Sequence, residues 1–169
     1  MLKGVTICLA LALGVTSAAA GVAEDCVQGK DHDLTIKACT ELLEKYKLDD
    51  ANKAAVHYNR ANAHDEKENY PAAIVDYDKA IALKPDLQQA YYNRGRALRL
   101  NGQPVLAVAS YNKALELDTK DADSLSNRGR AYLDLGEKEK AIADFRAALV
   151  INPTHDLALP HLKELGIEP

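Results

Sequence analysis

Small and hydrophobic residues recur at helical spacing along most of the chain, and their pattern repeats every 34 residues. In each repeat a bulky residue is followed three positions later by alanine and six positions later by Leu or Ile, the spacing of a buried helical stripe. The three sets are Tyr77, Ala80 and Leu83; Tyr111, Ala114 and Leu117; and Phe145, Ala148 and Ile151. The pattern predicts one such helix in each repeat.

A second helix precedes it. The tripeptides Asn59-Arg60-Ala61, Asn93-Arg94-Gly95 and Asn127-Arg128-Gly129 align without a gap and define units 54–87, 88–121 and 122–155. Small residues at these positions favour close approach of the two helices. Turn residues separate the helices in each unit and helix-stopping residues end two of the units. The turn residues are Glu68-Asn69, Gly102 and Gly136. The end residues are Pro85 and Pro153, and Thr119 occupies the equivalent position in the middle unit.

A 34-residue helix-turn-helix with these columns resembles the tetratricopeptide repeat (TPR) family. The resemblance is carried by segments such as 91–97 (Tyr-Tyr-Asn-Arg-Gly-Arg-Ala) and 141–145 (Ala-Ile-Ala-Asp-Phe). It departs from the family pattern at His57, His64 and Thr119. It implies an all-α, right-handed superhelical solenoid of antiparallel helix pairs, with three full repeats, an N-terminal partial repeat and a C-terminal capping helix.

The segments on either side of the repeats fit this architecture. Residues 24–53 are expected to form the N-terminal capping or degenerate repeat, with a helix over 32–47. Residues 156–169 are expected to form the C-terminal capping helix, with Asp156 as its N-cap. Such caps cover the ends of a repeat array.

Residues 1–23 are typical of a secretory signal peptide. Lys3 precedes an apolar run from Val5 to Val15, and small residues follow. Cleavage is expected after Ala20 or Ala23. An uncleaved anchor is the alternative, although the run is shorter than the roughly 20 residues of a membrane span. The interpretation predicts transport across an inner membrane and a periplasmic location, although a eukaryotic secretory route remains open.

Export would leave two cysteines, Cys26 and Cys39, in an oxidising compartment. We predict a structural disulfide between them. Two buried free thiols are the alternative, and a redox pair is disfavoured because the CxxC spacing is absent.

By resemblance to the TPR family, the first helix of each repeat lines a concave groove. The ligand-binding candidates in that groove are Asn59, Asn62, Tyr92, Asn93, Arg96, Arg99, Asn127 and Arg130. A column of Asn carboxamides can pair with the backbone of an extended peptide, and the arginines suit a carboxylate. An acidic or C-terminal peptide is therefore the predicted ligand. The competing interpretation is that these asparagines are common in TPR helices and that the arginines pair within the protein.

A separate arginine column predicts internal ion pairs. Arg60 and Arg128 each precede an aspartate by sixteen residues, whereas Arg94 precedes Ser110. We predict partly buried pairs from Arg60 to Asp76 and from Arg128 to Asp144.

The sequence contains no constellation for catalysis, cofactor binding or metal binding. It lacks a Gly-rich phosphate loop and a nucleophile elbow, and His57 and His64 are expected to pack in the repeat rather than to bind a metal. The net charge of -4 disfavours nucleic acid as a partner. The sequence thus predicts a non-enzymatic adaptor for a partner protein or peptide, with a structural, self-oligomerising envelope module as the alternative.

Overall fold

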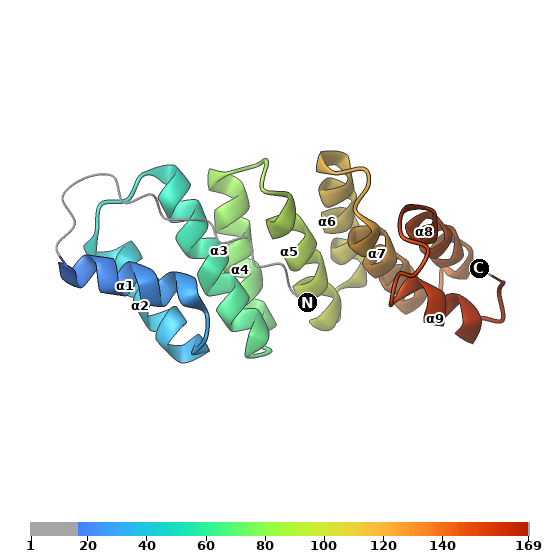
Figure 1. Cartoon of the computed structure of the whole chain (residues 1–169), viewed down its shortest axis with the longest axis horizontal. Helices are drawn as coiled ribbons and strands as arrows, with labels where there is room; N and C mark the ends of the chain where they lie inside the picture. The colour runs from blue at the N-terminus through green and yellow to red at the C-terminus, as the bar shows by residue number, and fades with distance from the viewer. Residues whose placement is uncertain (1–16, 169) are drawn as a thin grey trace. The chain divides into compact units, whose positions relative to one another are not determined.

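The computed structural model describes residues 17–168, and within this range the chain folds into α-helices joined by turns (Figure 1). Its internal contacts divide the chain into two compact units, the first ending at Leu87 and the second beginning at Gln88. The prediction of an all-helical TPR-like fold is confirmed.

The first unit contains four helices, each of which contacts the next. They are α1 (Ser17–Gln28), α2 (His32–Lys45), α3 (Asp50–Glu66) and α4 (Tyr70–Leu83). Aspartates set the start of two of them, because the Asp31 and Asp49 carboxylates accept hydrogen bonds from backbone N–H groups of the first turns of α2 and α3. The helix predicted over 32–47 is therefore present, but α1, with which it pairs, was not predicted.

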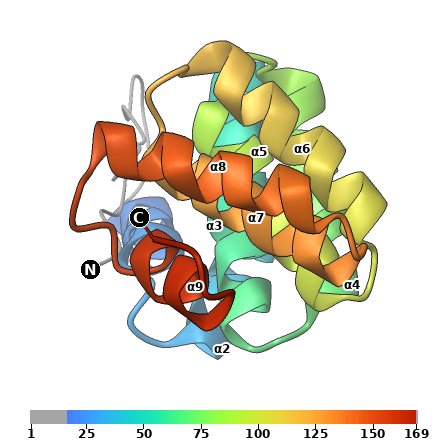
Figure 2. The same ribbon diagram turned by 90° about the vertical axis from the view of Figure 1, so that its right-hand side faces the viewer.

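The second unit contains two further helix pairs and a short final helix. They are α5 (Gln88–Leu100), α6 (Pro104–Leu117), α7 (Ala122–Asp134), α8 (Lys138–Ile151) and α9 (Ala158–Glu164). The α9 helix contacts α8, as Figure 2 shows.

The predicted N-cap of α9 is wrong. Asp156 makes no cap hydrogen bond. Instead the Nδ1 atom of His155 accepts from the backbone N–H groups of Leu157 and Ala158, each at 3.3 Å. His155 can do this because it is buried beside Ser126, whose hydroxyl lies 3.2 Å from the same nitrogen. A buried ring is held more firmly at the helix start than the exposed Asp156 side chain.

The predicted turns are confirmed in backbone conformation. Gly102 and Gly136 have φ angles of 74° and 75°, and Glu68 occupies the equivalent place with φ 58°. Glycine adopts this left-handed region without steric cost, whereas Glu68 does so at a modest cost.

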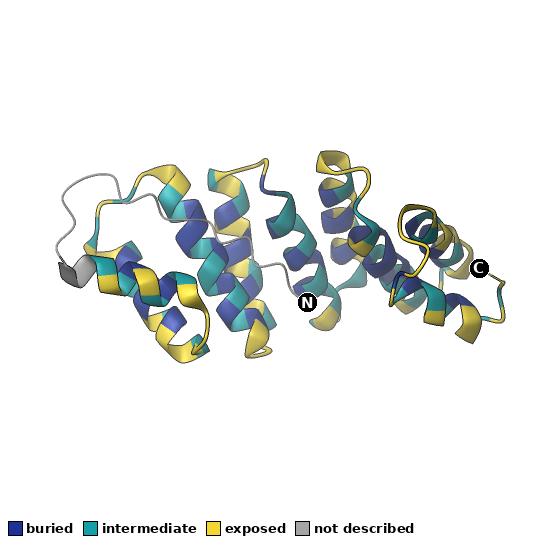
Figure 3. Cartoon of the chain, viewed as in Figure 1, coloured by how far each residue is buried: buried dark blue, intermediate teal, exposed yellow. Residues whose placement is uncertain are grey.

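Buried faces lie between the paired helices (Figure 3). Tyr77, Tyr111 and Phe145 are fully buried. In the second unit the glycine column allows this packing, since a Cβ at Gly95 would lie 2.7 Å from the Tyr111 ring and one at Gly129 would lie 2.8 Å from Phe145. The small residues therefore set how closely each helix pair can approach.

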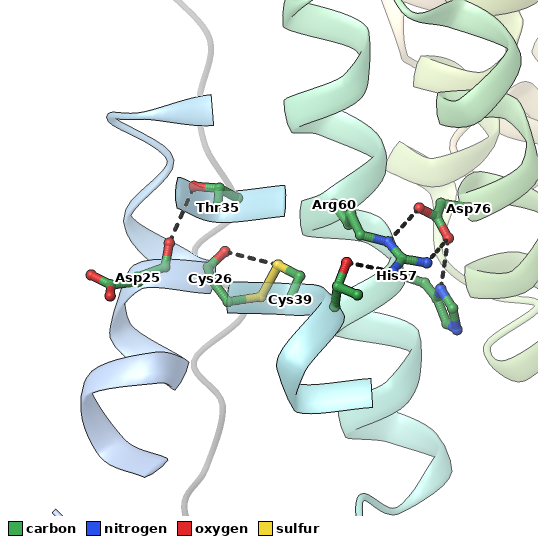
Figure 4. The surroundings of a disulfide bond; sticks show 8 residues. Asp25, Cys26, Thr35, Cys39, His57, Arg60 and Asp76 are labelled. Carbon is green, nitrogen blue, oxygen red and sulfur yellow. Dashed lines mark hydrogen bonds and ion pairs between the residues drawn. A yellow bond between two sulfur atoms is a disulfide. The ribbon is translucent and has the colours of Figure 1, made fainter. Parts of the chain in front are cut away.

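The predicted disulfide joins α1 to α2. Cys26 and Cys39 are fully buried, with their Cα atoms 4.9 Å apart (Figure 4). Residues 1–16 of the predicted signal peptide lie outside the described residues, and its remaining residues begin α1. Among the helices of the described range, none is long and apolar enough to cross a membrane.

Candidate functional site

Three arginines gather on the first helices of two successive repeats in the second unit. Arg96 and Arg99 lie on α5 and Arg130 lies on α7, and these two helices contact each other. All three guanidinium groups influence the titration of Tyr111, which places their charges near its hydroxyl. The 34-residue register explains this gathering, because Arg96 and Arg130 occupy the same position in their repeats.

Arg99 forms an ion pair at the edge of this cluster. Its Nη1 atom donates to the Asp134 carboxylate at 3.2 Å, and its side chain is only 10% exposed. Its Nε atom is buried and has no hydrogen-bond partner within the described residues. Arg99 thus retains an unused N–H group.

Arg130 has no hydrogen bond or ion pair with any described residue, although it is partly buried. Desolvation, and next the charge of nearby Arg99, lower the pKa of its guanidinium. A guanidinium nevertheless stays protonated at physiological pH. Arg130 is therefore a partly buried cation that no described residue pairs with directly, and the charge of the nearby Asp134 carboxylate only partly offsets the effects that lower its pKa.

Two tyrosine hydroxyls lie beside the arginines. The rings of Tyr92 and Tyr111 are 6.0 Å apart. Burial raises the pKa of Tyr92 to about 12 and raises that of Tyr111 as well, so both remain protonated donors. The Tyr111 hydroxyl is buried without a partner among the described residues. Arg99 Nε, Arg130 and Tyr111 Oη together offer donors and positive charge to an anion.

The predicted Asn column is less uniform than expected. Asn127 is buried, and its Nδ2 atom donates internally to the Tyr92 hydroxyl at 3.2 Å and to the Asp123 carbonyl at 3.0 Å. Asn93 is buried too. Asn59, in the first unit, is partly exposed, and its Nδ2 atom has no hydrogen-bond partner among the described residues. The neighbouring candidate Asn62 accepts a hydrogen bond from the Tyr77 hydroxyl at 2.7 Å.

The predicted internal ion pairs are present. Arg60 binds the Asp76 carboxylate through Nε at 2.7 Å and Nη2 at 2.8 Å, while its Nη1 reaches Thr40 at 2.9 Å (Figure 4). His57 Nδ1 also lies 2.8 Å from Asp76. His57 therefore packs within the repeat as expected, but as a hydrogen-bond partner of a carboxylate rather than as a substitute for an aromatic residue.

The second unit contains an equivalent ion pair in its last repeat, and a hydrogen bond to serine takes the place of that pair in the middle repeat. Arg128 binds both oxygens of Asp144 at 2.8 and 2.7 Å. In the middle repeat, where serine replaces the aspartate, Arg94 donates to the Ser110 hydroxyl at 2.6 Å. No group of three or more His, Cys, Asp or Glu residues in the described range could hold a metal ion.

Sequence inspection missed Tyr111 and Asp134 as members of the basic site. Tyr111 belongs to the packing column, and only the structure shows that its hydroxyl lies within the electrostatic influence of the arginines. Asp134 follows Arg99 by 35 residues, one more than the repeat length. A search for oppositely charged residues separated by about one repeat length would have found Asp134.

Family models described as tetratricopeptide repeat match residues 54–87, 122–155 and 76–109, and one described as TPR repeat matches 95–136. Together these matches span more than half of the chain, which therefore belongs to the tetratricopeptide repeat family. The fold of this family is a protein-interaction scaffold. No curated protein matches the sequence.

Solved structures agree with this assignment. The Arabidopsis OM64 TPR domain is 28% identical, with a TM-score of 0.67, and the match covers 69% of this chain and 97% of that one. The first TPR of Spaghetti (RPAP3), bound to the HSP90 peptide SRMEEVD, is 25% identical, with a TM-score of 0.66 and coverages of 69% and 92%. YrrB, a TPR protein with an unusual peptide-binding site, is 21% identical, with a TM-score of 0.78 and coverages of 86% and 75%, and shows likeness of fold alone.

Proposed function

We propose that the protein is a non-enzymatic adaptor that holds an acidic or C-terminal segment of a partner protein at the arginine cluster of the second unit. The observation that carries this proposal is Arg130, a partly buried cation that makes no hydrogen bond or ion pair with a described residue. A buried charge is costly unless an opposite charge accompanies it. A carboxylate of the partner would supply that charge.

The surrounding groups favour a carboxylate over a neutral ligand. The Arg99 Nε and Tyr111 Oη donors are buried without partners in the described chain. An oxygen anion could accept from several of these donors, and such charge-assisted hydrogen bonds are stronger than neutral ones. Arg96 would add positive charge at the same place.

A related structure supports the same ligand chemistry. The first TPR of Spaghetti (RPAP3) is bound to a peptide of sequence SRMEEVD. This peptide contains two glutamates and a C-terminal aspartate, so it carries several carboxylates. It is therefore a convenient chemical probe for this protein.

Replacing Arg130 by glutamine should weaken binding of an SRMEEVD peptide at least tenfold. The loss of one charge-assisted hydrogen bond, about 1.5–3 kcal/mol, corresponds to a tenfold change or more. Fluorescence anisotropy of a labelled peptide measures this. Arg146→Gln is the matched control, because Arg146 is exposed on α8 of the same unit.

Two further arms make this experiment decisive. Asp134→Asn should strengthen binding severalfold, since it removes a negative charge and frees the Arg99 Nη1 donor. Replacing the peptide carboxylates by amides should weaken binding as Arg130→Gln does. Equal affinity of the parent, Arg130→Gln and Arg146→Gln would exclude this cluster as the binding site.

A structural, self-oligomerising module is the second candidate function. It is favoured by apolar side chains exposed on the second helices of repeats, where Val105 is 65% and Val150 is 84% exposed. Sedimentation velocity separates the two candidates. A concentration-dependent oligomer that Val150→Lys dissolves would support self-association, whereas a monomer would support the adaptor.

We also propose export to the periplasm, with removal of the N-terminal segment. The apolar run with its following small residues and the buried Cys26–Cys39 disulfide support this proposal. Ala23 packs with Cys26 in the core of the first unit, so cleavage after Ala20 would preserve that packing and cleavage after Ala23 would remove it. We therefore expect N-terminal sequencing of the exported protein to begin at Gly21. A sequence starting at Met1 would contradict cleavage.

A further inference from the structure

Both ring nitrogens of His155, the residue that caps α9, have polar partners. The Nδ1 atom accepts from the backbone N–H groups of Leu157 and Ala158, each at 3.3 Å, and lies 3.2 Å from the Ser126 hydroxyl. The Nε2 atom lies 3.1 Å from the Asp123 carboxylate on α7. Because the side chain is only 3% exposed, these partners rather than water decide which nitrogen carries a proton.

These contacts fix the tautomer of the neutral ring. A backbone N–H can only donate, so Nδ1 must be unprotonated to accept from two such groups. The proton of the neutral ring therefore lies on Nε2, which donates to Asp123. Serine, histidine and aspartate are also the residue types of a catalytic triad, but Ser126 is fully buried and its hydroxyl cannot reach a substrate.

A second proton on the ring would reverse the role of Nδ1. The nitrogen would become a donor that faces two backbone N–H groups, which cannot rotate away while α9 keeps its place. The Ser126 hydroxyl, in contrast, can rotate and accept. Imidazole is the side chain whose charge changes near physiological pH. Protonation of the ring would therefore remove both cap hydrogen bonds of α9.

Two carboxylates face the ring and determine where a new N–H group would donate. Asp123 on α7 is already the partner of Nε2. Asp156, in the loop before α9, has a carboxylate oxygen 3.8 Å from Nδ1 and is 92% exposed, so its side chain can turn toward that nitrogen. Within the described residues, no further side chain of α7, α8 or α9 makes a hydrogen bond or ion pair with the ring. Asp156 is thus the acceptor for a proton on Nδ1.

The geometry points to His155 as an acid-sensitive switch at the start of α9. With Nδ1 unprotonated the ring caps the helix, and with Nδ1 protonated it donates to Asp156 and releases the N–H groups of Leu157 and Ala158. The α9 helix has only seven residues, of which Ala158 and Leu162 are buried in the apolar cluster of the last repeat. A helix this short is not stable by itself and depends on its cap and its packing. Acid therefore loosens α9 from the end of the second unit.

NMR of the ¹⁵N-labelled oxidised protein tests each step. At pH 8 the ¹⁵N shifts of the ring should place the proton of His155 on Nε2. As the pH falls from 8 to 5, the amide proton shifts of Leu157 and Ala158 should change together with the charge of the ring. Over the same range the protection of α9 amides against hydrogen exchange, corrected for intrinsic rates, should fall at least tenfold, whereas amides in the middle of α5 and α7 should keep theirs.

Variants separate the switch from a general effect of acid. His155→Gln keeps a side-chain acceptor but cannot gain a proton, so the protection of α9 should no longer depend on pH in this range. His161→Gln is the matched control and should respond as the parent does, because His161 lies on α9 but pairs with Glu164 at 3.0 Å. Asp156→Asn should reduce the response, and an undiminished response would overturn the role of Asp156.

The parent protein alone can also refute the switch, whatever the variants do. A proton on Nδ1 at pH 8 would overturn the assigned tautomer and with it the proposal. A ring that stays uncharged down to pH 5 would overturn it too. So would a charged ring with unchanged shifts and unchanged exchange in α9, or an equal acid response in His155→Gln.

Discussion

Replacing Asp76 by alanine is expected to lower the free energy of unfolding of the first unit by about 3–5 kcal/mol. The carboxylate is 5% exposed and receives two hydrogen bonds from Arg60 and one contact from His57. Its removal leaves the Arg60 guanidinium, itself only 16% exposed, without its ionic partner. An uncompensated buried charge of this kind is among the most destabilising of single changes.

Urea denaturation followed by circular dichroism measures this loss. Glu44→Ala is the matched control, because Glu44 is an exposed carboxylate on α2 of the same unit. Asp144→Ala should cost less, since Arg128 is 21% exposed and still donates to Asn112. Equal stability of Asp76→Ala and Glu44→Ala would show that the network contributes nothing measurable.

The same carboxylate predicts a specific dependence on pH. Burial raises its pKa, but the hydrogen bonds from His57 and Arg60 and their charges outweigh burial and lower the pKa from 3.8 to about 2. A carboxyl with a lowered pKa in the folded state stabilises the fold above its unfolded value, and this stabilisation is lost as the pH falls. The parent protein should therefore lose about 2 kcal/mol from this group between pH 4 and pH 2. Asp76→Ala should lack that part of the acid dependence.

The 34-residue register explains why the sequence could predict these ion pairs. Once the repeat is aligned, a residue on the first helix and one sixteen places later on the second helix face each other in every copy. Ser110 could thus be predicted as an exception, and the structure shows it accepting from Arg94. The helix pairs, their turns and the aromatic columns were predictable for the same reason.

Features outside the repeat pattern could not be predicted in this way. The α1 helix begins within a segment whose composition is typical of a signal peptide, so nothing in the repeat indicated a helix there. The role of His155 depends on its burial between α7 and the start of α9, which no local spacing encodes. The unpartnered donors of Arg99 and Tyr111 likewise depend on three-dimensional packing. Sequence spacing does not show that no acceptor lies within hydrogen-bond distance of them.

Removing the disulfide is the second change for which we expect a large effect. The double variant Cys26→Ala and Cys39→Ala should lower the free energy of unfolding by about 2–4 kcal/mol. In the chain-entropy model a crosslink stabilises the fold by restricting the unfolded chain, and a loop of about 15 residues corresponds to roughly 3 kcal/mol. The two cysteines are 13 residues apart, close to that length.

The loss should be concentrated at the N-terminal end of the first unit. The α1 helix packs on α2 and α3 through a small cluster that contains Val22, Ala23 and Val56 besides the two cysteines. Among the described residues, α1 contributes Val22, Ala23 and Cys26 to this cluster, and local opening is favoured where an element buries few large side chains. Without the crosslink, α1 should therefore exchange its amide hydrogens faster than α3 and α4, which keep the Arg60–Asp76 pair.

Hydrogen exchange and urea denaturation of three samples test this expectation. They are the oxidised parent, the parent reduced with dithiothreitol, and the double alanine variant, for which added reductant should change nothing. Reduction of the parent should reproduce the variant in both stability and faster exchange in α1. An oxidised parent that matches the variant in both measurements would mean that packing alone holds α1 against α2, and that the crosslink adds no stability to this end of the repeat array.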